Sequence, residues 1–157
     1  MRTVLVVSLV AVPGFVFAGY AKQETEFHLD APTAKVCNWI EHHPADLERA
    51  AGATVLAERD VYAKLDQSDE HGQNVFWVKR SAQRGRYREV LTESVIGAMS
   101  REQTDVLVVP NESGECDVTI QMTATVDGVA NMKIAVASRR AIRGMRGLAE
   151  RTFGQQD

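Results

Sequence analysis

Residues 116–127, CDVTIQMTATVD, decide the fold of this chain together with the pattern that follows them up to residue 153. Within residues 116–127 every second side chain is apolar, and the side chains between them are polar. Such alternation predicts a β-strand with one packed face and one face in water. The apolar face of the sheet that contains this strand must therefore be covered by another element.

The covering element follows directly in the sequence. Beyond Asp127-Gly128 the period becomes helical, which predicts one long helix that Gly154 ends. Its apolar stripe consists of Ile134, Ala137, Ala141, Ile142, Met145, Leu148, Ala149 and Phe153. Gly144 and Gly147 interrupt the helix at a cost of roughly 1 kcal/mol each relative to Ala. We expect a strand or a ligand to approach the helix closely there.

The remaining patterns complete an α+β fold. Alternating or β-branched residues predict strands at 24–30, 53–65, 75–80, 86–96 and 104–109. Asp30 is the expected N-cap of a first short helix, and Pro44 separates that helix from a second one at residues 45–51. This order predicts a curved antiparallel β-sheet that grips the long C-terminal helix, with the two short helices closing one end. A cavity between sheet and helix follows, and such cavities bind apolar molecules.

Both ends of the chain resemble a known superfamily. The opening carries Phe27-His28-Leu29-Asp30-Ala31-Pro32, Val36, Trp39-Ile40, His43-Pro44 and Leu47, and the closing helix carries Asn131, Ser138-Arg139-Arg140-Ala141-Ile142 and Leu148. With these residues the chain resembles the START-like helix-grip superfamily (SRPBCC; polyketide cyclase/dehydrase and lipid transport proteins) over residues 24–153. The resemblance implies a cavity for a hydrophobic ligand. Residues 48–52 replace the usual aromatic-rich close of the second short helix.

The first residues predict a targeting segment. Arg2 precedes an apolar run at residues 4–18, which fits a secretory signal peptide and falls short of the about 20 residues of a membrane helix. We expect cleavage after Ala18, with Ala21 as a second option. Residues 1–18 are then the signal peptide, residues 19–157 are a single helix-grip domain, and the mature protein is periplasmic or extracellular. An uncleaved anchor from Val4 to Ala21 is the alternative.

Charge limits the classes of partner. The formal net charge is −3, whereas domains that bind nucleic acid usually carry a basic surplus. We therefore expect no nucleic-acid partner. Arginines are concentrated on the long helix, at Arg139, Arg140, Arg143, Arg146 and Arg151. They form either a solvated basic face or a contact with an anionic membrane surface.

The redox state expected for the two cysteines depends on the compartment. In an oxidising compartment Cys37 and Cys116 are expected to form a disulfide. The alternative is two free thiols in the core. The bridge requires the last strand to run antiparallel beside the first, because the start of the last strand then lies near the first helix.

No motif in the sequence names a reaction. A nucleophile elbow, a phosphate loop and a dinucleotide fingerprint are all missing from the sequence, so no catalytic residue is assigned and no cofactor is expected. His42 and His43 point about 100° apart on a helix, which argues against a metal site. The carboxylates are expected on the wet faces of strands rather than as an acid–base pair; they are Glu89, Glu93, Asp117 and Asp127.

The fold and the resemblance together predict a binding protein. We expect an exported, non-enzymatic carrier or sensor of a hydrophobic small molecule or lipid, and a cyclase/dehydratase-type enzyme is the alternative. A carrier needs an almost wholly apolar lining, whereas an enzyme needs a buried acid, His or Tyr converging on one point. The residues expected to contact the ligand are Trp77, Tyr87, Met122, Ile142 and Met145.

Overall fold

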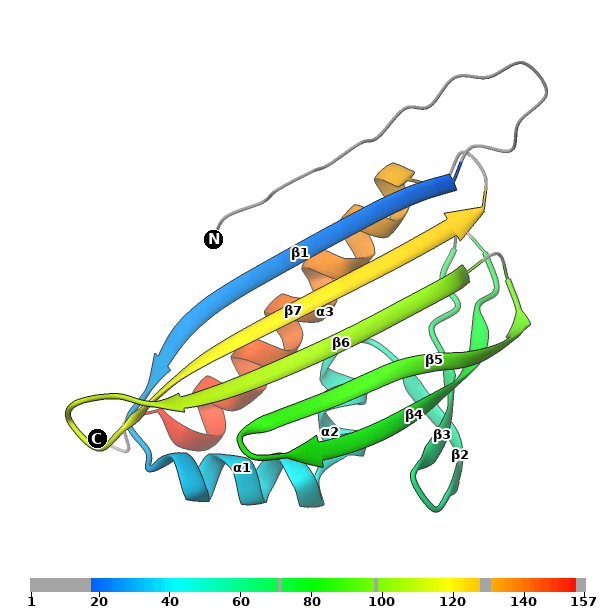
Figure 1. Cartoon of the computed structure of the whole chain (residues 1–157). Helices are drawn as coiled ribbons and strands as arrows, with labels where there is room; N and C mark the ends of the chain where they lie inside the picture. The colour runs from blue at the N-terminus through cyan, green and yellow to red at the C-terminus, as the bar shows by residue number, and fades with distance from the viewer. Residues whose placement is uncertain (1–17, 71, 98, 128–130, 155–157) are drawn as a thin grey trace.

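The structure is a computed structural model that describes residues 18–70, 72–97, 99–127 and 131–154 (Figure 1). The elements in chain order are β1 (Ala18–Leu29), α1 (Thr33–His42), α2 (Pro44–Ala50), β2 (Thr54–Arg59), β3 (Tyr62–Asp66), β4 (Val75–Gln83), β5 (Arg86–Ile96), β6 (Met99–Pro110), β7 (Cys116–Asp127) and α3 (Asn131–Phe153). The predicted α+β class is confirmed. The signal peptide, apart from Ala18, and Gly128 of the expected turn lie outside the described residues.

The strands form one antiparallel sheet in the order β1-β7-β6-β5-β4-β3-β2. The sheet curves around α3, which lies along its concave face, and α1 and α2 lie at one end of this grip (Figure 1). β1 pairs with β7 along its whole length, from Ala18 opposite Asp127 to Leu29 opposite Cys116. The prediction that the first and last strands are antiparallel neighbours is confirmed.

Two predicted strands have different bounds. The single strand expected at residues 53–65 is a hairpin of β2 and β3, because Asp60 takes a φ of 54°, a left-handed conformation that Asp tolerates. β1 begins at Ala18 rather than at residue 24, because its pairing with β7 continues to the end of that strand.

The expected N-cap at Asp30 was wrong. Pro32 occupies the N-cap position of α1 with an extended ψ of 139° and makes no side-chain cap. Asp30 lies before this extended residue, and its carboxylate instead lies 3.2 Å from Nε2 of His28. At the other end of α1, Nδ1 of His42 and Nδ1 of His43 contact the carbonyls of Asn38 and Trp39 at 2.7 and 2.9 Å.

The core lies between the concave face and α3. Its main cluster joins Phe27 and Leu29 of β1, Val118 and Ile120 of β7, and Ile142, Met145 and Phe153 of α3. The predicted stripe of α3 is confirmed at Ala141, Ile142, Met145, Ala149 and Phe153, which are buried. Ala137 is exposed and Ser138 is buried instead, and the side chain of Ile134 lies outside the described set.

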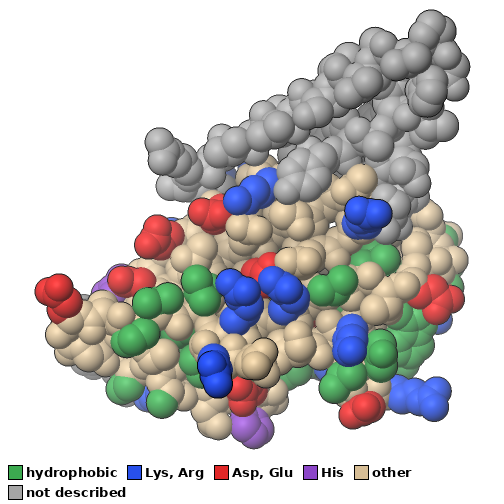
Figure 2. All heavy atoms as spheres, in the orientation of Figure 1, with side chains coloured by type: hydrophobic (Ala, Val, Ile, Leu, Met, Phe, Trp, Pro, Cys, Tyr) green, Lys and Arg blue, Asp and Glu red, His purple; other side chains and the backbone are tan. Residues whose placement is uncertain are grey.

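The outer face of the sheet is the wet face that the alternation predicted. Basic and acidic side chains are interspersed on it, with hydrophobic groups between them (Figure 2). Within the described residues, no helix is both long enough and apolar enough to cross a membrane.

Candidate ligand site

The concave face has an apolar end and a polar end. Near α1 it carries Phe27, Leu29, Val108 and Val118, all buried. Towards the other end of β1 and β7, a row of residues crosses five strands through successive cross-strand pairs. This polar row consists of Gln23 (β1), Met122 (β7), Thr104 (β6), Glu89 (β5) and Arg80 (β4). Directly opposite residues point to the same face of a sheet, so these side chains are neighbours.

Glu102 stands in the next row. Ala21, Ala124 and Glu102 are opposite one another on β1, β7 and β6. Gln23 is 1% exposed and Glu102 is 8% exposed, yet Oε2 of Glu102 and Nε2 of Gln23 make no hydrogen bond. Buried polar atoms nearly always have a partner. The polar row and Glu102 are together called the polar end, and its unpartnered atoms mark a place where a polar group can bind.

Burial sets the protonation of the two acids in the polar end. It raises the pKa of Glu89 to about 8, and the nearby charge of Glu48 acts in the same direction. It also raises the pKa of Glu102 to about 7. The Tyr87 hydroxyl donates a hydrogen bond to Oε1 of Glu89 at 2.6 Å, and burial followed by the Glu89 charge raises the pKa of Tyr87. These carboxyls can therefore gain or lose a proton near neutral pH.

Arg80 is already occupied by other carboxylates. Its Nε and Nη2 donate to the two carboxylate oxygens of Glu48 at 2.7 and 2.5 Å, and its Nη1 donates to Glu58 at 2.6 Å. Glu48 comes from α2 and is 2% exposed. Arg80 thus neutralises Glu48 at the edge of the polar end.

The structure brings together four of the five predicted ligand contacts. Tyr87, Met122, Ile142 and Met145 are buried in the main core cluster. Trp77 does not join them. It pairs with Lys64 and Glu93 on the outer face of the sheet, because its neighbours in β4, Phe76 and Val78, take the inward positions. That a ligand contacts the four buried residues stays a prediction.

The four carboxylates that were expected on the wet faces of strands do not all lie there. Glu89 turns inward, contrary to expectation, whereas Glu93 is exposed. The cause is a β-bulge, since Trp77 and Val78 pair with Glu93 and Leu91 and leave Thr92 as an extra residue. Asp117 pairs with the exposed His28 on the outer face, and the side chain of Asp127 is outside the described set.

Sequence reasoning missed Gln23, Arg80 and Glu102. For Gln23 and Glu102 a signal exists in the strand period. Glu102 is in phase with the buried Thr104 and Val106 of β6, and Gln23 is in phase with the buried Thr25 and Phe27 of β1. The period therefore places both side chains on the concave face.

The cysteines are both free thiols in the structure, Cys116 buried and Cys37 half-buried. Burial raises the pKa of both, and Cys37 further raises the pKa of Cys116, which places the two thiols near each other. A small pocket of about 10 Å³ adjoins Cys37, with room for about one water molecule. Its lining includes Cys37, Ile40, Glu41, Arg86, Tyr87 and Val108. The disulfide stays a prediction.

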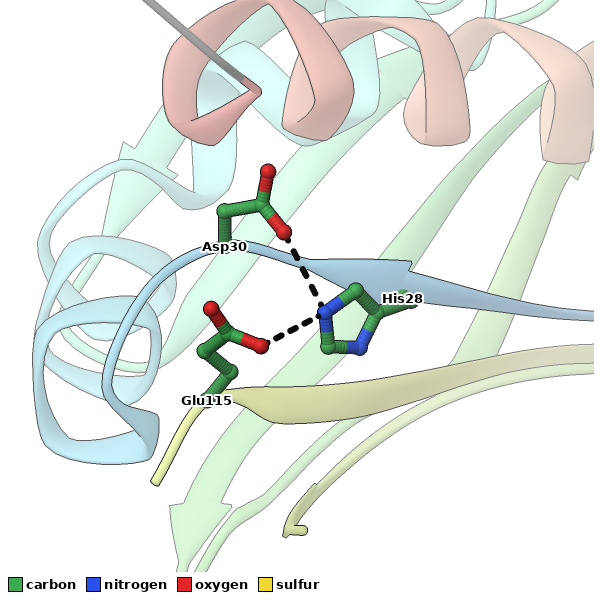
Figure 3. A group of neighbouring side chains, drawn as sticks. All are labelled: His28, Asp30 and Glu115. Carbon is green, nitrogen blue, oxygen red and sulfur yellow. Dashed lines mark hydrogen bonds and ion pairs between the residues drawn. The ribbon is translucent and has the colours of Figure 1, made fainter. Parts of the chain in front are cut away.

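One surface group has ligand atoms suited to a metal ion. The Nε2 of His28, a carboxylate oxygen of Asp30 and one of Glu115 lie within 4.8 Å of one another (Figure 3). Nε2 is 3.2 Å from Asp30 and 3.0 Å from Glu115, and Nδ1 is 3.1 Å from Asp117. The hydrogen bond with Asp117, opposed in part by burial and joined by that with Glu115, raises the pKa of His28. A protonated His28 accounts for this arrangement without an ion.

The arginines of α3 do not form a uniform face. Arg140, Arg143 and Arg151 are exposed. Arg146 pairs with Glu150 at 2.7 Å and lies over the Phe27 ring at 5.3 Å from its centre. Contact of this helix with a membrane stays a prediction.

Solved structures share this arrangement of sheet and helix. No protein-family model matches the sequence, and no curated protein is similar to it in sequence. A START superfamily protein from Mycobacterium smegmatis has a TM-score of 0.62 at 11% identity, with 85% of this chain and 99% of that chain covered. The chain has the START-like helix-grip fold.

Two further structures widen the range of the helix-grip fold. The Zhui aromatase/cyclase from Streptomyces sp. R1128 has a TM-score of 0.61 at 14% identity, with 84% of this chain and 94% of that chain covered. The ginseng major latex-like protein 151 from Panax ginseng has a TM-score of 0.55 at 10% identity, with 83% and 97% covered. At such low identity the similarity shows the fold alone. The same fold occurs in an aromatase/cyclase and in a major latex-like protein, so it does not by itself decide the function.

Proposed function

We propose that this protein binds a hydrophobic molecule, a lipid or a polyketide-like compound, between the concave face of its sheet and α3. It acts outside the cytoplasm as a non-enzymatic carrier or sensor. The observation that carries the proposal is the division of one buried face into an apolar and a polar end. An amphiphile fits such a face, because its tail packs along Ile120 and Ile142 while its polar group reaches Gln23 and Glu102.

The export part of the proposal rests on the N-terminal segment and on the start of β1. Cleavage after Ala18 leaves β1 whole from Gly19 onward. Cleavage after Ala21 removes a residue that is 3% exposed and stands opposite Ala124. We therefore expect the mature chain to begin at Gly19. N-terminal sequencing of exported protein tests this, and an intact Met1 in a soluble cytosolic fraction would overturn it.

Ligand binding is tested by native mass spectrometry of protein extracted under mild conditions. We expect a co-purifying hydrophobic molecule. Ala124→Phe fills the floor between Gln23 and Glu102 and should release that molecule. Thr123→Phe, on the outer face of the same strand, should retain it. If the wild-type protein is empty and takes up no added amphiphile, the proposal fails.

The polar end departs from the almost wholly apolar lining expected of a carrier, and it therefore favours a second candidate, a cyclase/dehydratase-type enzyme. Tyr87 and Glu102, both buried, and the half-buried Glu89 are groups of the kind that an acid–base reaction needs. The pKa values of about 8 for Glu89 and about 7 for Glu102 suit proton transfer at neutral pH. The two candidates differ in what becomes of the ligand. A carrier returns it unchanged, whereas a dehydratase returns it lighter by one water, and Glu89→Gln should then stop the mass change without preventing binding.

A further inference from the structure

The polar end contains more acid than base. Glu48, Glu89 and Glu102 bring three carboxyl groups into the interior, and Glu58 adds one at the edge. Arg80 is the cation among them, and its Nε, Nη1 and Nη2 all donate to Glu48 and Glu58. The hydrogen-bond donor to Glu89 is the neutral hydroxyl of Tyr87. Within the described part of the chain, two interior carboxyl groups are thus left without an ion pair.

The unpartnered atoms surround a floor of small side chains. Oε2 of Glu102 and Nε2 of Gln23 stand on β6 and β1, with β7 between them. At that level β1 and β7 contribute Ala21 and Ala124, whose methyl groups leave more room than the Phe27 and Val118 of the apolar end. A buried polar atom without a partner destabilises the fold. It is retained most readily where a ligand completes its hydrogen bonds.

We infer that the polar end binds the protonated amine of a single-chain amphiphile, with Glu102 and Glu89 as its acceptors. This inference rests on the proposed function, because it assumes that the tail lies between the sheet and α3. Carboxylates and an ammonium group form charge-assisted hydrogen bonds, which are the strongest of the common kinds. The Nε2 of Gln23 is free to donate to a hydroxyl or carbonyl oxygen next to that amine.

The same charges select against other head groups. A bound ammonium group favours the ionised forms of Glu89 and Glu102, whereas a fatty-acid carboxylate cannot lie close to either carboxyl in its ionised form, because like charges at short distance repel. An alcohol accepts and donates hydrogen bonds but brings no charge to pair with Glu89 and Glu102. The order of affinity expected for one chain length is therefore amine, then alcohol, then carboxylate.

Titration calorimetry with dodecylamine, dodecanol and dodecanoate at neutral pH tests this order. We expect dodecylamine to bind at least about tenfold more tightly than dodecanol, as one charge-assisted pair predicts. Glu102→Gln and Glu89→Gln should each reduce that preference, because the amine loses a charge-assisted hydrogen bond, whereas the alcohol exchanges one neutral hydrogen-bond partner for another. Glu93→Gln, on the outer face of β5, is the matched control and should keep the preference. Thermal melts verify that each variant is folded.

The outcomes separate the two proposals. Equal binding of dodecylamine and dodecanol overturns the amine assignment and leaves hydrophobic binding intact. Failure of all three to bind overturns the proposed function itself. Lysophosphatidylethanolamine distinguishes the source of the amine, since tighter binding of this lipid than of dodecylamine assigns the site to a phospholipid head group and weaker binding assigns it to a lone amine. A preference that survives in both Glu102→Gln and Glu89→Gln also overturns the inference.

Discussion

Arg80 of β4 and Glu48 of α2 form a two-point ion pair inside the protein, with Nε–Oε1 and Nη2–Oε2 distances of 2.7 and 2.5 Å. Burial raises the pKa of Glu48, and the contacts from Arg80 act in the opposite direction. Although burial alone would lower the pKa of Arg80, its hydrogen bonds to Glu48 and Glu58 raise it above the ordinary value. The pair fastens α2, which also packs against α3, to the sheet beside the polar end.

Removing one partner of this pair should be costly. Arg80→Met leaves Glu48 buried without a cation, and we expect a loss of about 3 kcal/mol in the free energy of unfolding. The double variant Arg80→Met/Glu48→Met should recover most of that loss, because no charge is then left unpaired. Urea denaturation measures both. Arg49→Met breaks an exposed pair with Asp46 and serves as control; a loss from Arg80→Met as small as the control's would contradict the argument.

Glu102 should make stability depend on pH. Its pKa in the folded protein is about 7, raised from an ordinary 4.5, so folding favours the neutral acid. The associated stability is present at low pH and is lost as pH rises through about 7. We expect a loss of roughly 3 kcal/mol from this group between about pH 4 and about pH 8, since each pKa unit corresponds to roughly 1.4 kcal/mol.

Glu102→Gln should therefore flatten the curve of unfolding free energy against pH and leave the variant more stable than the wild type at alkaline pH. Glu93→Gln changes an exposed carboxylate of β5 and should leave the curve unaltered. Chemical denaturation across the pH range measures both. Parallel curves for wild type and Glu102→Gln would show that folding does not raise the pKa of this carboxyl, and would contradict the prediction.

Much of the fold could be predicted from the sequence because its two ends have strong periods. The alternation at residues 116–127 and the stripe of α3 determined which elements form and which faces they bury. Local backbone features were harder. Neither the turn at Asp60 nor the bulge at Thr92 has a sequence signature like that of Asn-Gly. The first feature divided one predicted strand into two, and the second separated Glu89 from Glu93.

The polar end was missed for a different reason. Acidic residues on strands are usually solvated, so their residue type predicted that Glu89 faces the solvent and did not single out Glu102. The strand period contained the information for Glu102 and Gln23. The strand period could not predict the pairing of Arg80 with Glu48, because that pairing depends on how α2 docks on the sheet. Prediction of such a site needs the period to be given more weight than residue type.

Gly144 marks where α2 meets α3. A Cβ atom at Gly144 would overlap the carbonyl oxygen of Ala50 in α2, so close approach, expected at this residue, comes from a helix rather than from a strand or a ligand. Gly144→Ala should destabilise the protein by about 1–3 kcal/mol, as overpacking does. Gly147→Ala is the control, since its Cβ would meet only the mobile end of the Arg151 side chain. It should be neutral or stabilising by up to about 1 kcal/mol. Thermal melts measure both variants. If the melting temperatures of Gly144→Ala and Gly147→Ala both lay above or both lay below that of the wild type, this packing would be refuted.

Cys37 and Cys116 should be joined in the exported protein. Cys116 stands opposite Leu29 at the end of β1, just before α1, which carries Cys37. Cys116 belongs to the main cluster, and Cys37 packs against that cluster. The bridge closes a loop of about 80 residues and is worth roughly 4 kcal/mol in the chain-entropy model, less any strain. Thiol counting must be done on denatured, unreduced protein, because burial raises the pKa of both thiols and slows their labelling in the folded state. We expect no free thiol and a lower melting temperature after reduction. Cys37→Ser should show one thiol and the melting temperature of the reduced protein, whereas two thiols in the wild type would leave both residues as ordinary core side chains.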